Sequence, residues 1–139
     1  MTYTKQKVKL FQITGITANS IKHVTYKIPR ELISIEGIQT MCFLAMGVPA
    51  KKLIPIECAL LTLNLNDKAI NPMQRYPVMG ICNMSFRKNR KKYLPITVNE
   101  TVKAGSFIHA SLEDKGNSNL YPYTVTVYLY GTVEKELIP

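Results

Sequence analysis

The chain has 139 residues, which is the size of a single domain with one hydrophobic core. With 46% hydrophobic and 19% charged residues, its composition is typical of a folded globular protein and excludes a disordered one. A transmembrane helix needs an apolar run of about 18 residues, and the sequence has no run of that length. The N-terminus also lacks the apolar segment and the cleavage site of a signal peptide. We therefore expect one domain over residues 1–139, without a transmembrane segment, that stays inside the cell where it is made.

The formal net charge is +9, and two segments carry all of the excess. Residues 1–30 contain six Lys or Arg and no acid, and residues 68–99 contain seven and no acid. In the two other parts of the chain, 31–67 and 100–139, acidic residues outnumber basic ones. This asymmetry favours attraction to a polyanion or to an acidic partner surface, although it would also serve to keep the protein in solution.

Alternation of apolar and polar residues with a period of two dominates the chain, which is typical of half-buried β-strands. Turn-forming residues separate the alternating segments. The only candidate helix, residues 29–38, contains β-branched residues that argue against it. In chain order, the pattern predicts strands at residues 7–14, 24–28, 31–38, 40–48, 60–65, 79–86, 94–99, 106–112 and 123–133.

The spacing of these strands predicts an all-β fold, an antiparallel β-sandwich of about eight strands that is jelly-roll-like and has no substantial helix. The alternation also predicts which side chains enter the core. These are Val24, Tyr26, Ile28, Leu61, Leu63, Leu65, Ile108, Ala110, Leu112, Tyr123, Val125, Val127 and Leu129.

The sequence contains no recognisable catalytic set. Its two histidines, His23 and His109, both fall inside predicted strands, and we expect His109 to be a strand-face residue with a satisfied hydrogen bond. No Ser-His-Asp, Cys-His or two-carboxylate signature accompanies them. We therefore expect a protein that is not an enzyme and has no catalytic residues, although residues distant in sequence could still meet in space.

No cofactor or metal is expected either. The three cysteines, Cys42, Cys58 and Cys82, are widely spaced within apolar stretches, which indicates small buried side chains rather than a metal or redox pair. The oxygen-rich segments 63–71 and 112–119 lack the alternating acids of a calcium loop. Turn formation explains their composition.

The most unusual feature is a basic segment with five cations in six residues. Such a density of charge must project into water or onto an anion, because it cannot be buried without partners. The arginines can bind phosphate bidentately and the lysines act as point charges. We predict contact with a polyanion or a charged partner at Arg87, Lys88, Arg90, Lys91 and Lys92.

Four aromatic residues are candidates for stacking or for an interface. Phe86 and Tyr93 flank the basic segment and could stack on bases, or could be the last inward residues of two strands. Tyr128 and Tyr130 are expected on the outer side of the last strand, where they suit a protein interface. Alternatively, that strand lies centrally in a sheet and both of its faces are covered.

In layout, residues 8–133 resemble the small single jelly-roll capsid, penton and minor virion proteins of icosahedral viruses and bacteriophages. The resemblance is carried by the alternation in ALLTLNLND, the strand–turn–strand VNETVKAGSFIHASLED and the closing YPYTVTVYLYGTV. It implies a non-enzymatic virion subunit that self-assembles with copies of itself or with other virion subunits, and that is assembled in the host cytoplasm. Many such proteins have a basic N-terminal arm, whereas this N-terminus has only Lys5, Lys7 and Lys9. The basic segment could then replace that arm in contacting nucleic acid or an anionic membrane.

Two alternatives remain open from the sequence. The first is a cytoplasmic single-stranded nucleic-acid-binding protein on an OB-like barrel, which the basic segment favours but the strand count opposes. The second is a carbohydrate- or ligand-binding β-sandwich module, which the exposed tyrosines would suit.

Overall fold

The structure is a computed structural model that describes residues 2–44, 56–82, 96–116 and 121–136. These residues form nine strands and no helix. In chain order the strands are β1 (Thr2–Ile16), β2 (Ile21–Lys27), β3 (Leu32–Leu44), β4 (Ile56–Leu65), β5 (Lys68–Ala69), β6 (Tyr76–Cys82), β7 (Ile96–Thr101), β8 (Phe107–Asp114) and β9 (Tyr123–Glu136). No helix in the described residues is long and apolar enough to cross a membrane.

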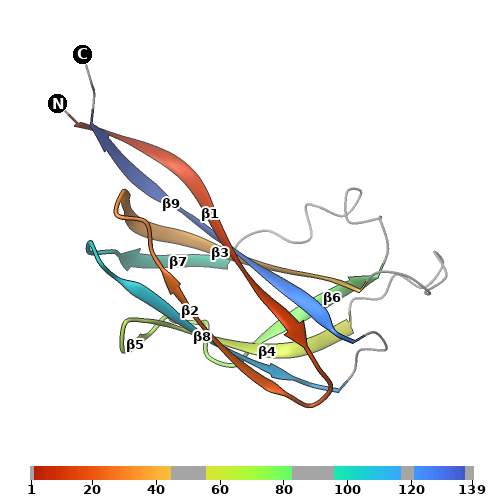
Figure 1. The fold of residues 1–139 in the computed structure, drawn as a ribbon. Coiled ribbons are helices and arrows are strands. Elements are labelled where there is room, and N and C mark those ends of the chain that lie inside the picture. The colour runs from red at the N-terminus through yellow and green to blue at the C-terminus, as the bar shows by residue number, and fades with distance from the viewer. Residues whose placement is uncertain (1, 45–55, 83–95, 117–120, 137–139) are drawn as a thin grey trace.

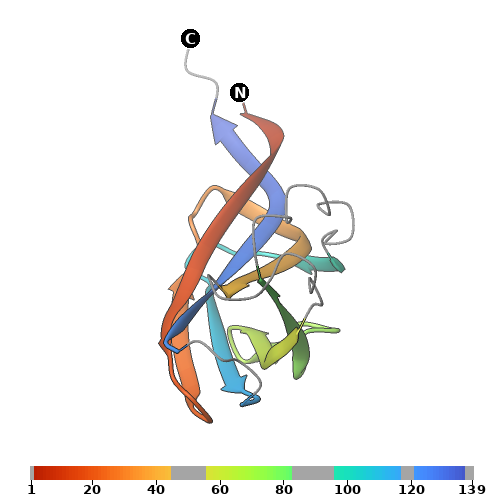
Figure 2. The ribbon, with the colours of Figure 1, turned by 90° about the vertical axis from the view of Figure 1, so that its right-hand side faces the viewer.

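The strands pair in the order β1-β9-β3-β6-β4-β8-β2, with β7 added to β3 and β5 added to β4. All pairs are antiparallel except a short parallel contact between β3 and β6. The path folds over so that β1, β9, β3 and β7 pack against β2, β8 and β4 as two layers (Figures 1 and 2). The predicted all-β sandwich of about eight strands without a helix is therefore confirmed, and the additional strand is the two-residue β5.

The predicted core is confirmed in β4, β8 and β9. All ten side chains that alternation assigned to it in these strands are buried. Of the three predicted at residues 24–28, Ile28 is buried, whereas Val24 and Tyr26 are partly buried against the core. In β8 this leaves Phe107 and His109 on the outside, and the polar positions of β9 are half-buried. The doubtful helix at residues 29–38 is a strand, because β3 begins at Leu32 and sends Leu32, Ile35 and Ile38 into the core.

The longest pairing joins the two ends of the chain. β1 and β9 run together from Thr2 opposite Glu136 to Ile13 opposite Val125. In Figure 1 the outer part of this pair extends beyond the other strands, and both termini lie at its tip. The hairpin that follows β1 brings β2 under it, where the rings of Phe11 and Tyr26 stack with their centroids 4.9 Å apart.

Candidate functional site

Most of the predicted site residues lie outside the described part of the chain. This applies to the cations Arg87, Lys88, Arg90, Lys91 and Lys92 and to the flanking aromatics Phe86 and Tyr93. Their assignment as a polyanion or partner contact therefore stays a prediction. The structure does place the other two candidates, Tyr128 and Tyr130, on β9.

Tyr128 and Tyr130 lie on the outer face of β9, half-buried, as expected for a strand between two neighbours. On β1, Leu10 lies opposite Tyr128 and Val8 lies opposite Tyr130. Leu10 is 51% exposed and Val8 is 43% exposed, which is unusual for large apolar side chains on a strand of this sandwich. We call these four side chains, Val8, Leu10, Tyr128 and Tyr130, the apolar face.

One tyrosine of the apolar face, Tyr130, is hydrogen-bonded to β3. The hydroxyl of Tyr130 donates a 2.7 Å hydrogen bond to the Oε1 atom of Gln39, which is buried. On β3, Gly37 lies opposite Tyr130 and Gln39 lies opposite Tyr128. This hydrogen bond orients the ring of Tyr130 within the apolar face.

A hydrogen-bonded carboxylate borders the apolar face toward the tip of the β1–β9 pair. Glu36 accepts hydrogen bonds from Thr132, Gln6 and Ser34 at 2.8, 2.8 and 3.2 Å. The bond from Thr132, and then that from Gln6, holds the pKa of Glu36 below its usual value. The carboxylate of Glu36 thus accepts three hydrogen bonds from side chains of its own sheet.

β1 is an edge strand. It ends the strand order, and among the described residues only β9 pairs with it. The ammonium group of Lys22 binds the carbonyl oxygen of Thr14 near the end of β1, so the accessible edge is the stretch before it. An edge of this length offers backbone donors and acceptors to a strand of another molecule. Natural proteins usually prevent such pairing between molecules with charged residues, proline or bulges at the edge.

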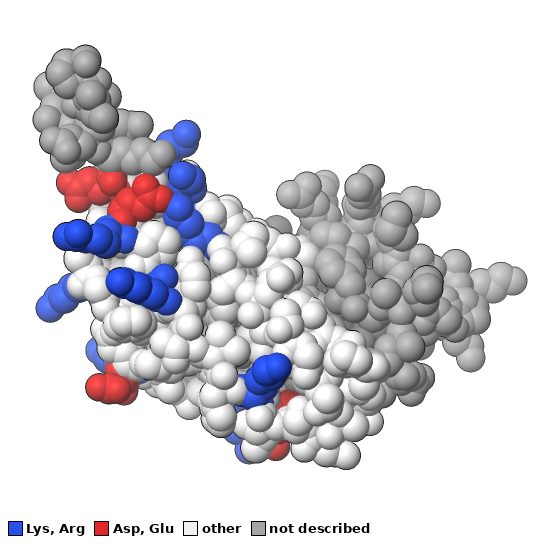
Figure 3. Space-filling view, in the orientation of Figure 1, with Lys and Arg blue, Asp and Glu red and all other residues white. Residues whose placement is uncertain are grey.

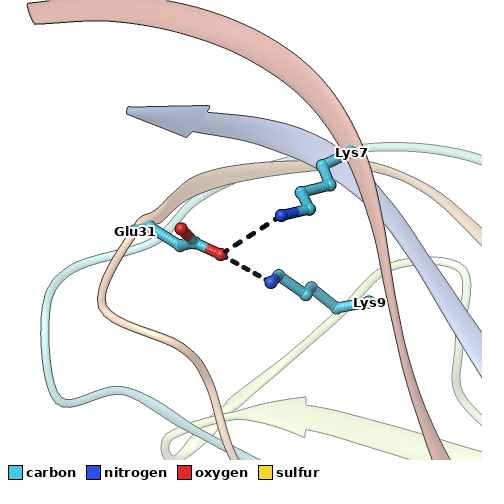
Figure 4. A network of polar contacts seen from close by, with 3 residues as sticks. All are labelled: Lys7, Lys9 and Glu31. Atoms are coloured by element: carbon cyan, nitrogen blue, oxygen red, sulfur yellow. Dashed lines mark hydrogen bonds and ion pairs between the residues drawn. The ribbon is translucent and has the colours of Figure 1, made fainter. Parts of the chain in front are cut away.

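The lysines of β1 project from the opposite face, away from Val8 and Leu10. Glu31 binds Lys9 at 2.5 Å and lies 3.9 Å from the ammonium group of Lys7 (Figure 4). Figure 3 shows basic and acidic side chains gathered where the β1–β9 pair leaves the body. Glu31 thus pairs with two of the three lysines of β1, and all three lie on the face opposite to Val8 and Leu10.

The outer face of the other layer carries both histidines. The Nδ1 atom of His23 lies 2.8 Å from the hydroxyl of Ser111, and that of His109 lies 3.2 Å from the hydroxyl of Thr25. Both imidazoles are exposed, as is expected of strand-face residues with hydrogen-bond partners. Over the described ranges, no three His, Cys, Asp or Glu side chains lie together as metal ligands would.

One buried carboxylate, Asp114, lies between the layers. Its oxygens accept hydrogen bonds from the hydroxyls of Tyr121 and Tyr123 and from the backbone N–H groups of Asn19 and Gly116. Burial is the largest single influence on Asp114 and raises its pKa, but the four hydrogen bonds together outweigh it and the net pKa is lowered. All four donors belong to the protein itself, so the arrangement indicates that Asp114 stabilises the fold and does not take part in a reaction.

Of the predicted buried cysteines, Cys42 and Cys58 are buried and not in disulfides, which confirms that part of the prediction. Cys82 ends β6, and its side chain lies outside the described part.

Val8 and Leu10 are the surface residues that the sequence reasoning missed. They alternate with Lys7 and Lys9, so amphipathic alternation alone would place them inside and the lysines outside. The structure has the reverse arrangement, because Phe11 and Ile13 enter the core and have the same parity as the lysines. The adjacent apolar residues Leu10 and Phe11 are the signal in the sequence that both faces of this strand carry apolar side chains.

The chain matches no protein-family model, no curated protein and no solved structure. Its function is therefore argued from the residues themselves.

Proposed function

We propose that the protein is a non-enzymatic structural subunit that self-assembles, and that the apolar face is its main contact surface. The observation that carries this proposal is the exposure of Val8 and Leu10 beside two half-buried tyrosines on an edge strand. Contiguous apolar surface that is bordered by polar groups is typical of protein–protein interfaces. Tyrosine is among the residues enriched there.

The energetic reason is the hydrophobic effect. Burying a Val or Leu side chain completely contributes about 1.5–3 kcal/mol relative to leaving it in water. About half of each is still exposed in the single subunit, so a partner could gain much of the remainder. Because β1 is also an edge strand, a partner would gain backbone hydrogen bonds at the same place.

The virion is the assembly that we propose for this subunit, as a capsid, penton or minor capsid protein with a jelly-roll-like sandwich. Support for this comes from the layout resemblance of residues 8–133 and from the sandwich fold. The basic segment at residues 87–92 would then contact an anionic partner, either packaged nucleic acid or an acidic neighbouring subunit. Support for a non-enzymatic role comes from Asp114, since this carboxylate, which is the most buried one in the described part of the chain, accepts hydrogen bonds from four donors of the protein itself.

The proposal is tested by measuring the oligomeric state of the purified chain by light scattering over a range of concentrations. We expect a dimer or a larger assembly for the wild-type chain and a monomer for Leu10→Asp, because a carboxylate at the apolar face would have to be desolvated on association. Ile21→Asp is the matched control, since Ile21 is 62% exposed on β2, away from the apolar face, and its replacement should leave the assembly unchanged. A wild-type chain that stays monomeric at high concentration would overturn the proposal.

A further inference from the structure

The outward-facing side chains of β1 have a symmetric order. Among the side chains of β1 that the structure describes, six share the face of Val8 and Leu10, and along the strand they are Thr4, Gln6, Val8, Leu10, Gln12 and Thr14. The order reads threonine, glutamine, aliphatic, aliphatic, glutamine and threonine, so it is nearly the same in both directions, with Lys9 at its centre. None of the six is charged, although the chain as a whole has a net charge of +9.

In an antiparallel pair of two such strands centred on Lys9, every outward residue would lie opposite a residue of the same chemical type. Val8 of one copy would lie opposite Leu10 of the other, Gln6 opposite Gln12, and Thr4 opposite Thr14. Directly opposed side chains are the neighbours whose contacts stabilise a sheet, and identical chains commonly meet about a two-fold axis in which each residue contact occurs twice. We propose that the edge of β1 pairs antiparallel with β1 of a second copy of this chain, about a two-fold axis at Lys9.

This inference rests on the proposed function and names the partner and its register. Only a two-fold axis perpendicular to the sheet joins the two β1 edges with both outer faces on the same side. An axis along the strands would give a parallel pair and would place the uncharged outer face of one copy beside the lysine face of the other. Moving the antiparallel axis from Lys9 to Val8 would set Gln6 against Leu10 and Thr4 against Gln12, so Leu10 would no longer lie opposite an aliphatic side chain across the pair.

The edge is long enough for such an interface. Residues 4–14 span about 35 Å at roughly 3.3 Å per residue. Pairing along this length would form on the order of ten backbone hydrogen bonds between copies, fewer at the end where Lys22 already binds the carbonyl oxygen of Thr14. The side-chain amides of Gln6 and Gln12 have donors and acceptors that can join across the pair.

The lysine at the axis is the main obstacle, because like charges directly opposite each other destabilise a sheet. In this structure the side chain of Lys9 turns beneath the sheet and binds Glu31 at 2.5 Å (Figure 4). Each copy therefore brings an ion pair to the axis rather than a lone cation. More distant charges still repel, and added salt screens them with a Debye length of about 8 Å at physiological ionic strength. Dimerisation should accordingly strengthen with salt.

Disulfide trapping with two single variants tests the pairing and its register. Gln6→Cys and Gln12→Cys each replace an exposed side chain, and opposed positions in an antiparallel pair have Cα atoms about 4.5–5.5 Å apart, within the range of a disulfide. A mixture of the two variants should yield a cross-linked dimer under mild oxidation. Its amount should exceed that from either variant alone on the order of tenfold, because pairing raises the effective concentration of the two thiols.

The controls separate this inference from the proposed function. The wild-type chain gives the background from the native cysteines, and Val8→Cys mixed with Leu10→Cys repeats the measurement at the adjacent pair in case one variant misfolds. If the wild-type chain associates by light scattering but neither mixture cross-links, this pairing is overturned while the proposed function stands. Cross-linking of Gln6→Cys alone would show a different register or a parallel pair and would also overturn the inference. A monomeric wild-type chain would overturn both proposals.

Discussion

The hydroxyl of Tyr123 donates a 2.5 Å hydrogen bond to Oδ1 of Asp114, and this bond joins the beginning of β9 to the end of β8. The other oxygen, Oδ2, accepts from the hydroxyl of Tyr121 at 3.0 Å and from the N–H groups of Asn19 and Gly116 at 2.8 and 3.1 Å. Asn19 belongs to the turn after β1. One buried carboxylate therefore connects three separate parts of the chain at one end of the sandwich.

Replacement of Asp114 by alanine should destabilise the fold strongly. Asp114 is only 5% exposed, and its removal takes this acceptor away from four donors, of which the Tyr123 hydroxyl also bonds the carbonyl oxygen of Cys58 at 3.3 Å. A buried donor that reaches neither water nor another acceptor costs about 1–3 kcal/mol. Since some of the four donors will find water, we expect the free energy of unfolding in urea to fall by about 3 kcal/mol. The control is Glu113→Ala, which removes an exposed ion pair with Arg75 at 3.6 Å and should cost less than about 1 kcal/mol. Equal losses in the two variants would contradict the assigned role of Asp114.

The stability of the protein should fall in acid partly because of the same residue. The pKa of Asp114 is lowered in the folded state by its hydrogen bonds, despite burial, whereas in the unfolded chain it is about 3.9. The unfolded state therefore takes up this proton first, so the contribution of Asp114 is complete above about pH 4 and is lost as the pH falls through its folded value. Urea unfolding measured between neutral pH and pH 2 should show a shallower decline for Asp114→Asn than for the wild-type chain.

Glu36→Gln is the comparison for this acid effect. The pKa of Glu36 is also lowered, by hydrogen bonds from Thr132 and Gln6, but this carboxylate is exposed. Its replacement should therefore change the pH dependence less than Asp114→Asn does. The opposite order would contradict the assignment of the acid effect to Asp114.

Gly131 should not tolerate a side chain. A Cβ atom added there would lie 2.0 Å from the backbone oxygen of Ser34, in a part of β3 where the register with β9 shifts. Since backbone cannot move aside as a side chain can, we expect Gly131→Ala to lower the free energy of unfolding by about 3 kcal/mol. Gly105→Ala is the contrast, because nothing lies within 4 Å of its added Cβ and the cost there is only that of a positive φ, about 1–2 kcal/mol. Thermal unfolding of the two variants measures the difference.

The basic segment should confer salt-dependent binding to anionic polymers. We expect the wild-type chain to bind a single-stranded oligonucleotide with an affinity that falls steeply as salt is added. Alanine at Arg87, Arg90, Lys91 and Lys92 should abolish this binding, because four phosphate contacts account for a slope of about 3 in log affinity against log salt. A double variant of the exposed residues Lys27 and Lys103 is the control. Unchanged binding in the fourfold variant would remove the segment from the contact.

Salt also separates this activity from self-association. Binding to the oligonucleotide should weaken with salt, whereas pairing of two positively charged copies along the uncharged face of β1 should strengthen. A single salt titration followed by light scattering and by oligonucleotide binding therefore distinguishes the two surfaces.

Much of the fold could be predicted from the sequence because the period of a strand is a local property. Wherever one face of a strand is buried and the other is not, as in β8, the alternation of Ile108, Ala110 and Leu112 with polar neighbours directly records the burial. The same reasoning located the buried face of β9. It did not identify Asp114 as a buried carboxylate, since periodicity says nothing of the donors that a buried charge needs, and these come from the turn after β1 and from the segment that follows β8.

β1 marks the limit of local reasoning. Its composition established a strand, the alternation of its lysines and the neutrality of its other face. Whether Val8 and Leu10 point inward, and whether the strand has one neighbour or two, depends on which segments pair with it. The tertiary structure decided both, because the partner β9 comes from the opposite end of the chain and because Phe11 rather than Leu10 stacks against the second layer. Side-chain periodicity is a local property of the sequence, whereas which strand lies at the edge of a sheet depends on how all the strands pair.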